Sequence, residues 1–124
     1  MNFIFFFPDE MSAGTLSSYG NPHCRTPHLD KLASEGTLFE NCFVQNPVCS
    51  PSRCSLMTGT YVHNRGHRTL WNLLKQDEPS LFRYLKNDGY QIRWYGKNDL
   101  YSKEYLEEIC TDIEEKRKEK DSFS

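Results

Sequence analysis

The chain has 124 residues and a formal net charge of −2. This length fits one small domain. The near-neutral charge offers no basic field for nucleic acid or for an acidic membrane surface, so we expect neither as a partner. The five cysteines lack the regular spacing of a disulfide framework, and they favour reduced thiols.

The first segment, residues 3–7, is an apolar run of phenylalanine and isoleucine that ends at Pro8. Such a run is typical of a strand buried on both faces of a parallel sheet. It has neither the basic start nor the small-residue cleavage site of a signal peptide. No segment reaches the length needed to cross a bilayer. We therefore expect a soluble, cytoplasmic protein.

Two carboxylates, Asp9 and Glu10, follow this run directly. The carboxyl end of a buried strand is where open α/β sheets bind ligands. Paired acids at that place suit a hard cation such as Ca²⁺ or Mg²⁺. The alternative for this pair is a solvated turn that binds nothing.

Residues 26–36 predict a helix, with Thr26 at the N-cap, Pro27 at the first helical position and Gly36 at the end. Its apolar stripe indicates a scaffold helix that packs on the sheet. Residues 37–44 predict the next strand. The expected core residues of that strand are Leu38, Phe39, Phe43 and Val44.

The stretch from residue 46 to residue 59 predicts a loop that delivers Cys49 to the first turn of a helix. Ser50 is suited to the N-cap, and Gly59 to the C-terminal stop. The positive end of a helix attracts anions, and Arg53 can lean back toward Cys49. We therefore expect a site for a negatively charged substrate, although a buried structural cysteine is the alternative.

Residues 61–68 predict a polar loop, and we expect His63 in it to contact substrate. His63 and His67 have helical spacing, but Gly66 disfavours a helix between them, so a histidine metal site is not expected. Residues 79–88 then predict a helix.

The strand expected at residues 90–95 places Lys97 just past its end. A compact ammonium there suits one oxygen of a sulfate or phosphate group. Ser102 starts the last expected helix, and residues 114–124 form a charged tail to which we assign no function. The apolar stripe of that helix consists of Tyr105, Leu106, Ile109 and Ile113.

Strands that alternate with helices predict an α/β fold, with a mostly parallel sheet flanked by helices. The acidic pair, the cysteine loop and Lys97 each follow a predicted strand. In one sheet, these three groups could meet at one edge.

The string Cys49-Ser50-Pro51-Ser52-Arg53, followed by Leu56-Met57-Thr58-Gly59, resembles the signature of the sulfatase family. In that family the cysteine is oxidised to formylglycine (3-oxoalanine), whose hydrated aldehyde is the nucleophile. The resemblance implies this fate for Cys49, and with it a formylglycine-generating or radical maturation enzyme as partner. It also implies that Arg53 stabilises the hydrate.

Two further strings are similar to the same family. The first strand and its acidic pair match a metal site that is usually Asp-Asp, which implies that Asp9, Glu10 and modified Cys49 hold Ca²⁺ or Mg²⁺. Gly96-Lys97 matches a string in which the lysine binds sulfate. Asp99 stands where the family has histidine, so that histidine's role does not carry over.

The resemblance implies hydrolysis of an aryl or carbohydrate sulfate by an alkaline-phosphatase-like domain. Residues 1–113 would be its N-terminal part, because family catalytic domains are several times longer. The later metal ligands have no counterpart, so we expect little activity from this fragment alone. The alternatives are a phosphate or phosphonate monoester hydrolase of the same superfamily, and a non-catalytic anion-binding remnant.

Overall fold

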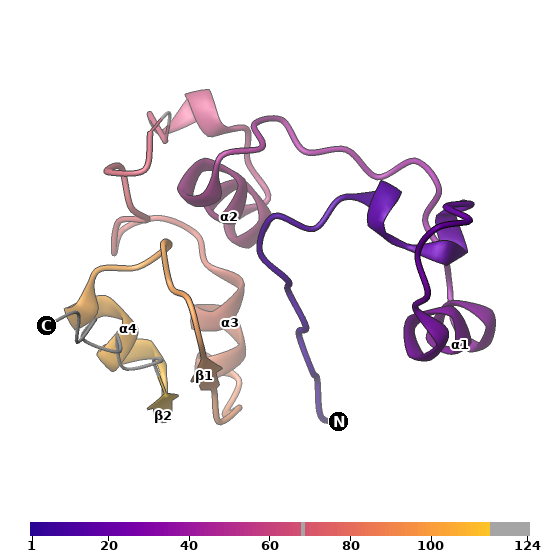
Figure 1. Ribbon diagram of the computed structural model, residues 1–124. Helices are drawn as coiled ribbons and strands as arrows, with labels where there is room; N and C mark the ends of the chain where they lie inside the picture. The colour runs from indigo at the N-terminus through magenta and orange to yellow at the C-terminus, as the bar shows by residue number, and fades with distance from the viewer. Residues whose placement is uncertain (68, 115–124) are drawn as a thin grey trace, which may run out of the picture. The chain divides into compact units, whose positions relative to one another are not determined.

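A computed structural model describes residues 1–67 and 69–114 of the chain. The chain divides into two compact units, residues 1–43 and residues 44–124. The charged tail expected at 114–124 lies outside the described residues, apart from Glu114, which ends a strand. Figure 1 shows the path of the chain through its helices and strands.

The first unit is built on one helix, α1, which spans Pro27–Glu35. Two short 3-10 turns, Ala13–Thr15 and Ser17–Tyr19, precede it. The expected helix is therefore confirmed, with Pro27 in its first turn. Thr26 does not cap the backbone, because its hydroxyl contacts the side chains of Ser17 and Asp30 at 2.7 and 3.1 Å.

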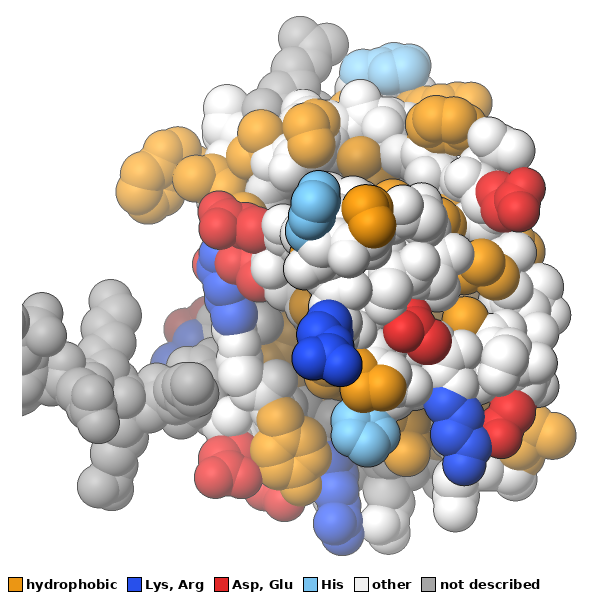
Figure 2. Space-filling model, turned by 45° about the vertical axis from the view of Figure 1, so that its right-hand side comes forward, with side chains coloured by type: hydrophobic (Ala, Val, Ile, Leu, Met, Phe, Trp, Pro, Cys, Tyr) orange, Lys and Arg blue, Asp and Glu red, His pale blue; other side chains and the backbone are white. Residues whose placement is uncertain are grey.

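The sequence predicted two strands, at residues 3–7 and 37–44, and both predictions are wrong. Residues 3–7 and 37–44 have no strand pairing, and their hydrophobic side chains are exposed, with Phe6 at 76% and Phe43 at 84%. Figure 2 shows hydrophobic side chains of this kind on the surface. A strand needs a neighbour to pair its backbone N–H and C=O groups. Among the described residues, neither segment has one.

In its described residues, the second unit contains three α-helices and a small sheet. Residues 93–95 (β1) and 112–114 (β2) pair in parallel, and Arg93 lies opposite Asp112. A helix connects the two strands, which makes a β–α–β unit. The elements of this unit are α2 (Cys49–Thr58), a 3-10 turn (Val62–Asn64), α3 (Leu81–Asn87), β1 (Arg93–Tyr95), α4 (Lys103–Ile109) and β2 (Asp112–Glu114).

Most of these elements match the expected ones, but they are shorter. The helix expected at 79–88 is α3, and the strand expected at 90–95 is β1. Ser102 caps α4 as expected, since its Oγ accepts a hydrogen bond from the N–H of Tyr105 at 3.2 Å. Ile113 was expected in the same helix, but α4 ends at Ile109, and Ile113 lies in β2.

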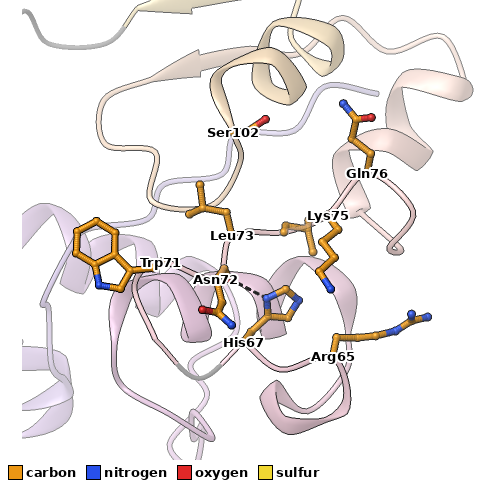
Figure 3. Close-up of a pocket in the computed structure, with 9 residues that line it drawn as sticks. Arg65, His67, Trp71, Asn72, Leu73, Lys75, Gln76 and Ser102 are labelled. Carbon is orange, nitrogen blue, oxygen red and sulfur yellow. Dashed lines mark hydrogen bonds between the residues drawn. The ribbon is translucent and has the colours of Figure 1, made fainter.

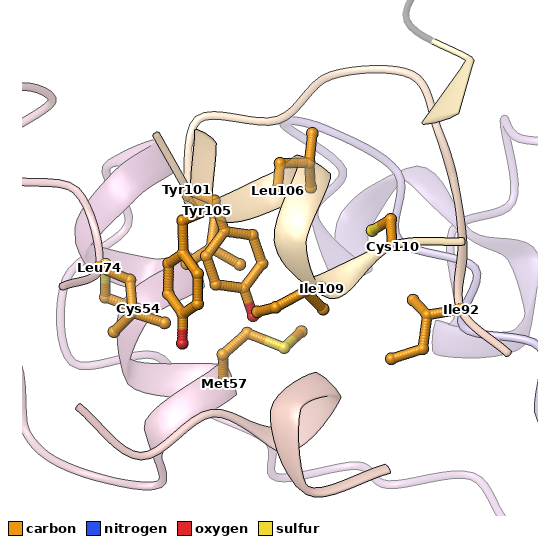
Figure 4. Packing of buried hydrophobic residues seen from close by; sticks show 10 residues of the cluster. Cys54, Met57, Leu74, Ile92, Tyr101, Tyr105, Leu106, Ile109 and Cys110 are labelled. Carbon is orange, nitrogen blue, oxygen red and sulfur yellow. The ribbon is translucent and has the colours of Figure 1, made fainter. Parts of the chain in front are cut away.

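The core of the second unit consists of buried side chains from α2, from α4 and from the segments that connect the helices and strands. Tyr101 and Tyr105 are each 1% exposed, and their rings pack edge to face with centroids 4.9 Å apart. Ser80 Oγ and the Tyr101 hydroxyl are 2.6 Å apart, which satisfies both buried polar groups. Figure 4 shows the cluster, which includes Cys54, Met57, Leu74, Ile92, Leu106, Ile109 and Cys110.

The fold class is therefore α/β, with parallel strands and flanking helices, as expected. Within the described part of the chain, no helix has both the length and the apolar character that a membrane span requires.

The buried thiols of the core predict a loss of stability at alkaline pH. Burial raises the pKa of Cys54 to about 12 and that of Cys110 to about 11, and the charge of Glu78 adds to the rise at Cys54. Both thiols start from an ordinary value of 9.0. Their contribution to stability is therefore complete below the unfolded pKa, and it is lost as pH rises through the folded values.

We expect the melting temperature to fall from about pH 9 to about pH 12, as the unfolded chain ionises first. Thermal unfolding followed by circular dichroism at several pH values measures this fall. Cys54→Ala should make it shallower, whereas Cys42→Ala, at an exposed cysteine, should not. Identical pH profiles for the two variants would contradict the assignment.

Candidate functional site

The candidate site begins at the first residue of α2, which is Cys49. The N-cap is Val48, not Ser50 as the sequence predicted. The N–H of Val48 donates to the side chain of Asn46 at 3.0 Å, which fixes the entry to the helix. Cys49 is partly exposed and lies at the positive end of the helix dipole.

Ser50 is not the cap because its side chain is used elsewhere. It is completely buried, and its hydroxyl donates to the backbone oxygen of Leu70 at 3.1 Å. At the other end of α2, Gly59 adopts the left-handed conformation with φ 69°, as a helix stop requires. The start of α2 is thus fixed to a second segment of the same unit.

Lys97 lies against the cysteine. Its Nζ donates to Cys49 Sγ at 3.5 Å, and it also forms an ion pair with Asp99 Oδ2 at 3.0 Å. The sequence placed Lys97 just beyond the strand now seen as β1, and the structure brings it to Cys49. This contact is the central feature of the site.

The loop that carries Lys97 is held by the side chain of Asn98. Its Oδ1 accepts the N–H groups of Leu100 and Tyr101 at 3.2 and 3.0 Å, and its Nδ2 donates to the oxygen of Tyr101 at 2.7 Å. Asp99 has φ 44°, a conformation that is unusual for any residue but glycine. Strained backbone of this kind is often found at functional sites.

Arg53 lies about one helical turn after Cys49 on α2. Residues at this spacing share one face of a helix, and the expected approach of the Arg53 guanidinium to Cys49 stays a prediction. Arg53 is only 6% exposed. The buried guanidinium of Arg53 lies on the same face of α2 as Cys49, and it adds positive charge to this end of the unit.

Asp9 and Glu10 belong to the first unit, whereas Cys49, Arg53 and Lys97 belong to the second. Both carboxylates are exposed, and Glu10 has φ 57°. No group of three or more histidine, cysteine or acidic residues that could hold a metal gathers among the described residues. The metal role of Asp9 and Glu10 stays a prediction.

His63, the expected substrate contact, is exposed in the 3-10 turn at 62–64. Its ring stacks on that of Tyr61, with centroids 5.7 Å apart and planes 17° apart. The two rings form a flat surface in the loop that follows α2. Neither His63 nor His67 belongs to a group of three or more potential metal ligands among the described residues.

Sequence reasoning missed the role of His67. It is 2% exposed, and its Nδ1 donates to the backbone oxygen of Asn72 at 2.8 Å. Its Nε2 lies 2.6 Å from Oε2 of Glu78, which is hydrogen-bond distance. Only the burial of both residues reveals this pair, and no sequence pattern signalled it. The pair fixes the ends of the segment between them.

The comparisons with known proteins show the family of the chain. A sequence profile described as Sulfatase matches residues 1–122. The chain belongs to the sulfatase family. The recognition made from the cysteine string is thereby confirmed.

Two curated relatives show how much of a sulfatase the chain matches. An N-acetylglucosamine-6-O-sulfatase of Bacteroides thetaiotaomicron is 33% identical over 101 residues, covering 82% of this chain and 18% of that protein. The human N-acetylgalactosamine-6-sulfatase is 37% identical over 109 residues, covering 77% and 21%. The chain therefore spans about a fifth of the length of these sulfatases.

A solved structure supports the same fold. It is a complex of a protein with its substrate D-glucosamine-2-N,6-O-disulfate, and it matches this sulfatase chain with a TM-score of 0.70 at 32% identity. The match covers 76% of this chain and 19% of the other. The expected alkaline-phosphatase-like, incomplete α/β fold is confirmed.

The buried His67–Glu78 pair predicts a large loss of stability when one partner is removed. Glu78 is 2% exposed, and its Oε1 has no hydrogen-bond partner among the described residues. His67→Ala would leave the carboxyl group buried and unpaired, so we expect a loss of about 3–5 kcal/mol.

Urea unfolding measures this loss. The matched control is Lys103→Ala, which breaks an exposed pair with Glu107 and should change stability by less than about 1 kcal/mol. Equal effects from the two variants would show that the buried pair contributes no more than an exposed one.

Proposed function

We propose that this chain forms the nucleophile-bearing and sulfate-binding part of a sulfuric ester hydrolase. The observation that carries the proposal is the contact of Lys97 Nζ with Cys49 Sγ, at 3.5 Å, on the first residue of α2. A lysine ammonium and a helix N-terminus are both suited to a sulfate group. Their convergence on the cysteine of the sulfatase signature supports this function over that of a structural thiol.

In this proposal the chain's own residues bind and polarise the sulfate. Lys97 and the start of α2 hold its oxygens as negative charge develops in the transition state. Donors placed in this way are each worth about 3–4 kcal/mol. Asp99 orients the ammonium of Lys97 through its 3.0 Å ion pair.

We propose that Cys49 is converted to formylglycine by a maturation enzyme of the formylglycine-generating or radical class. The hydrated aldehyde would supply the nucleophile and later release sulfate, so that water is the net reactant. Sγ of Cys49 marks the side-chain position where oxygen would replace sulfur. Its partial exposure leaves room for a maturation enzyme and for a substrate. Arg53, on the same face of α2, would stabilise the oxygens of the hydrate.

We propose that Asp9, with Glu10, contributes to a Ca²⁺ or Mg²⁺ site. Their carboxylate oxygens have the chemistry that these hard cations prefer. Such cations take six or more oxygen ligands, and the described residues gather no third acidic, histidine or cysteine ligand with them. These two residues would thus supply only part of the shell of oxygen ligands.

For the substrate, we propose a sulfated carbohydrate. The relatives in Bacteroides thetaiotaomicron and human carry names of hexosamine sulfatases, and the matched solved structure holds a sulfated glucosamine. The exposed stack of Tyr61 and His63 gives a flat aromatic surface of the kind that sugars bind.

The modification is tested by mass spectrometry of the peptide that spans residue 49. After coexpression with a maturation enzyme, we expect the Cys49 side chain to lose sulfur and gain an aldehyde oxygen. Cys54, in the same peptide, is fully buried in α2 and should remain a thiol. An unmodified Cys49 beside a maturation enzyme that converts a known sulfatase would contradict the proposal.

The activity is tested with 4-nitrophenyl sulfate and 4-nitrophenyl phosphate. We expect the matured chain alone to turn over aryl sulfate far below the ordinary enzyme rate of about 10 s⁻¹, and to prefer it to the phosphate. Cys49→Ala should abolish this turnover. Turnover that survives Cys49→Ala would contradict the mechanism, and a preference for phosphate would favour the phosphatase alternative.

A further inference from the structure

The second unit contains a pocket that is distinct from the contact of Lys97 with Cys49. It has a volume of about 490 Å³, a size suited to one or two sugar units. Figure 3 shows it between the loop after α2 and the segment that leads to α3. The lining side chains that matter here are Arg65, His67, Trp71, Lys75 and Gln76.

The pocket is positively charged. Arg65 and Lys75 are exposed in its wall, and no acidic residue is found among the described residues that line it. Neither cation forms an ion pair with a described residue. The ammonium of Lys75 points to the side where His67 and Arg65 lie (Figure 3). The buried carboxylate of Glu78 contacts the pocket residue His67 at 2.6 Å.

The other end of the pocket is aromatic. Trp71 is 89% exposed, so the face of its indole ring is open to a ligand. In Figure 3 its ring extends away from Lys75, so the aromatic and cationic ends are separate. An indole face suits the apolar face of a sugar ring, and the cations suit a sulfate or carboxylate that the sugar carries.

The pocket is physically joined to the candidate site. Ser50, next to Cys49, donates to the oxygen of Leu70 at 3.1 Å, directly before Trp71. On the other side, the N–H of Leu74 donates to the oxygen of Leu100 at 2.8 Å, just after the loop of Lys97. The segment between these two bonds forms part of the pocket wall.

We propose that this pocket binds a second anionic group of a sulfated saccharide, while the group to be hydrolysed lies at Cys49. The proposal rests on the proposed function for the nature of the substrate. It adds that Arg65 and Lys75 recognise an anion that is not hydrolysed, and that Trp71 stacks on the sugar that carries it.

Isothermal titration of the 124-residue chain tests this inference. The probes are a trisulfated heparin disaccharide, the unsulfated N-acetylated disaccharide and inorganic sulfate. We expect each of the variants Arg65→Ala and Lys75→Ala, which removes one cation, to bind the trisulfated disaccharide about tenfold more weakly. Trp71→Ala should weaken both disaccharides and leave inorganic sulfate unchanged.

The matched control is the double variant Lys31→Ala/Lys103→Ala, which removes two exposed lysines outside the pocket. It should retain the wild-type Kd, as should Arg65→Lys within a few-fold. Circular dichroism confirms that each variant is folded. Equal weakening in the pocket and control variants would overturn the proposal, because it would show attraction to net charge alone.

Cys49→Ala separates this inference from the proposed function. Binding in the pocket should persist in that variant, and in a chain whose Cys49 is a thiol. Binding that is lost in Cys49→Ala but unchanged in Arg65→Ala and Lys75→Ala would overturn the pocket and leave the proposed function standing. Failure to form the aldehyde at Cys49 would contradict the proposed function and leave the pocket measurement intact.

Discussion

The site depends on one interaction, the contact of Lys97 with Cys49 at the start of α2. A flexible lysine takes one position only when its backbone and its partners are fixed. The start of α2 is fixed by the hydrogen bond from the buried Ser50 hydroxyl to Leu70. The loop of Lys97 is fixed by the side chain of Asn98, and the ammonium of Lys97 by its ion pair with Asp99. The tyrosine and leucine core beneath them holds these segments together.

This constraint explains why the second unit can form the corner without a large sheet. In the described part of the unit only two short strands pair, but α2 contributes the buried Cys54 and Met57 to the core, and α4 contributes Tyr105, Leu106 and Ile109. Burial of such side chains is the main driving force for packing. The anion-attracting end of α2 is therefore placed by side-chain packing and a few buried hydrogen bonds.

Local signals predicted local structure well. Pro27 and Gly36 mark the limits of α1, Gly59 marks the end of α2, and Ser102 caps α4, since each acts through its own backbone or side chain. The strands expected at 3–7 and 37–44 failed because strand pairing needs a partner elsewhere, which a run of apolar residues does not supply. Ile113 fits a helical stripe by spacing, but pairing with β1 places it in a strand.

Part of the site could also be predicted from the sequence. The cysteine string identified the family. The sequence also predicted that Lys97 follows a strand, at a sheet edge where it could meet Cys49, and the two side chains lie 3.5 Å apart. The ion pair of Lys97 with Asp99 was missed, because the family has histidine at that position and the spacing alone does not show which way the carboxylate turns. The burial of His67 with Glu78 was missed because it depends on tertiary packing.

The most direct test of the anion-binding corner is a titration of the ¹⁵N-labelled chain with inorganic sulfate, followed by NMR. The account predicts saturable shifts of the backbone amides at the start of α2 and in the Lys97 loop, with binding weakened about tenfold or more in Lys97→Ala. Shifts that are absent from α2, or that keep the same Kd in Lys97→Ala, would contradict it.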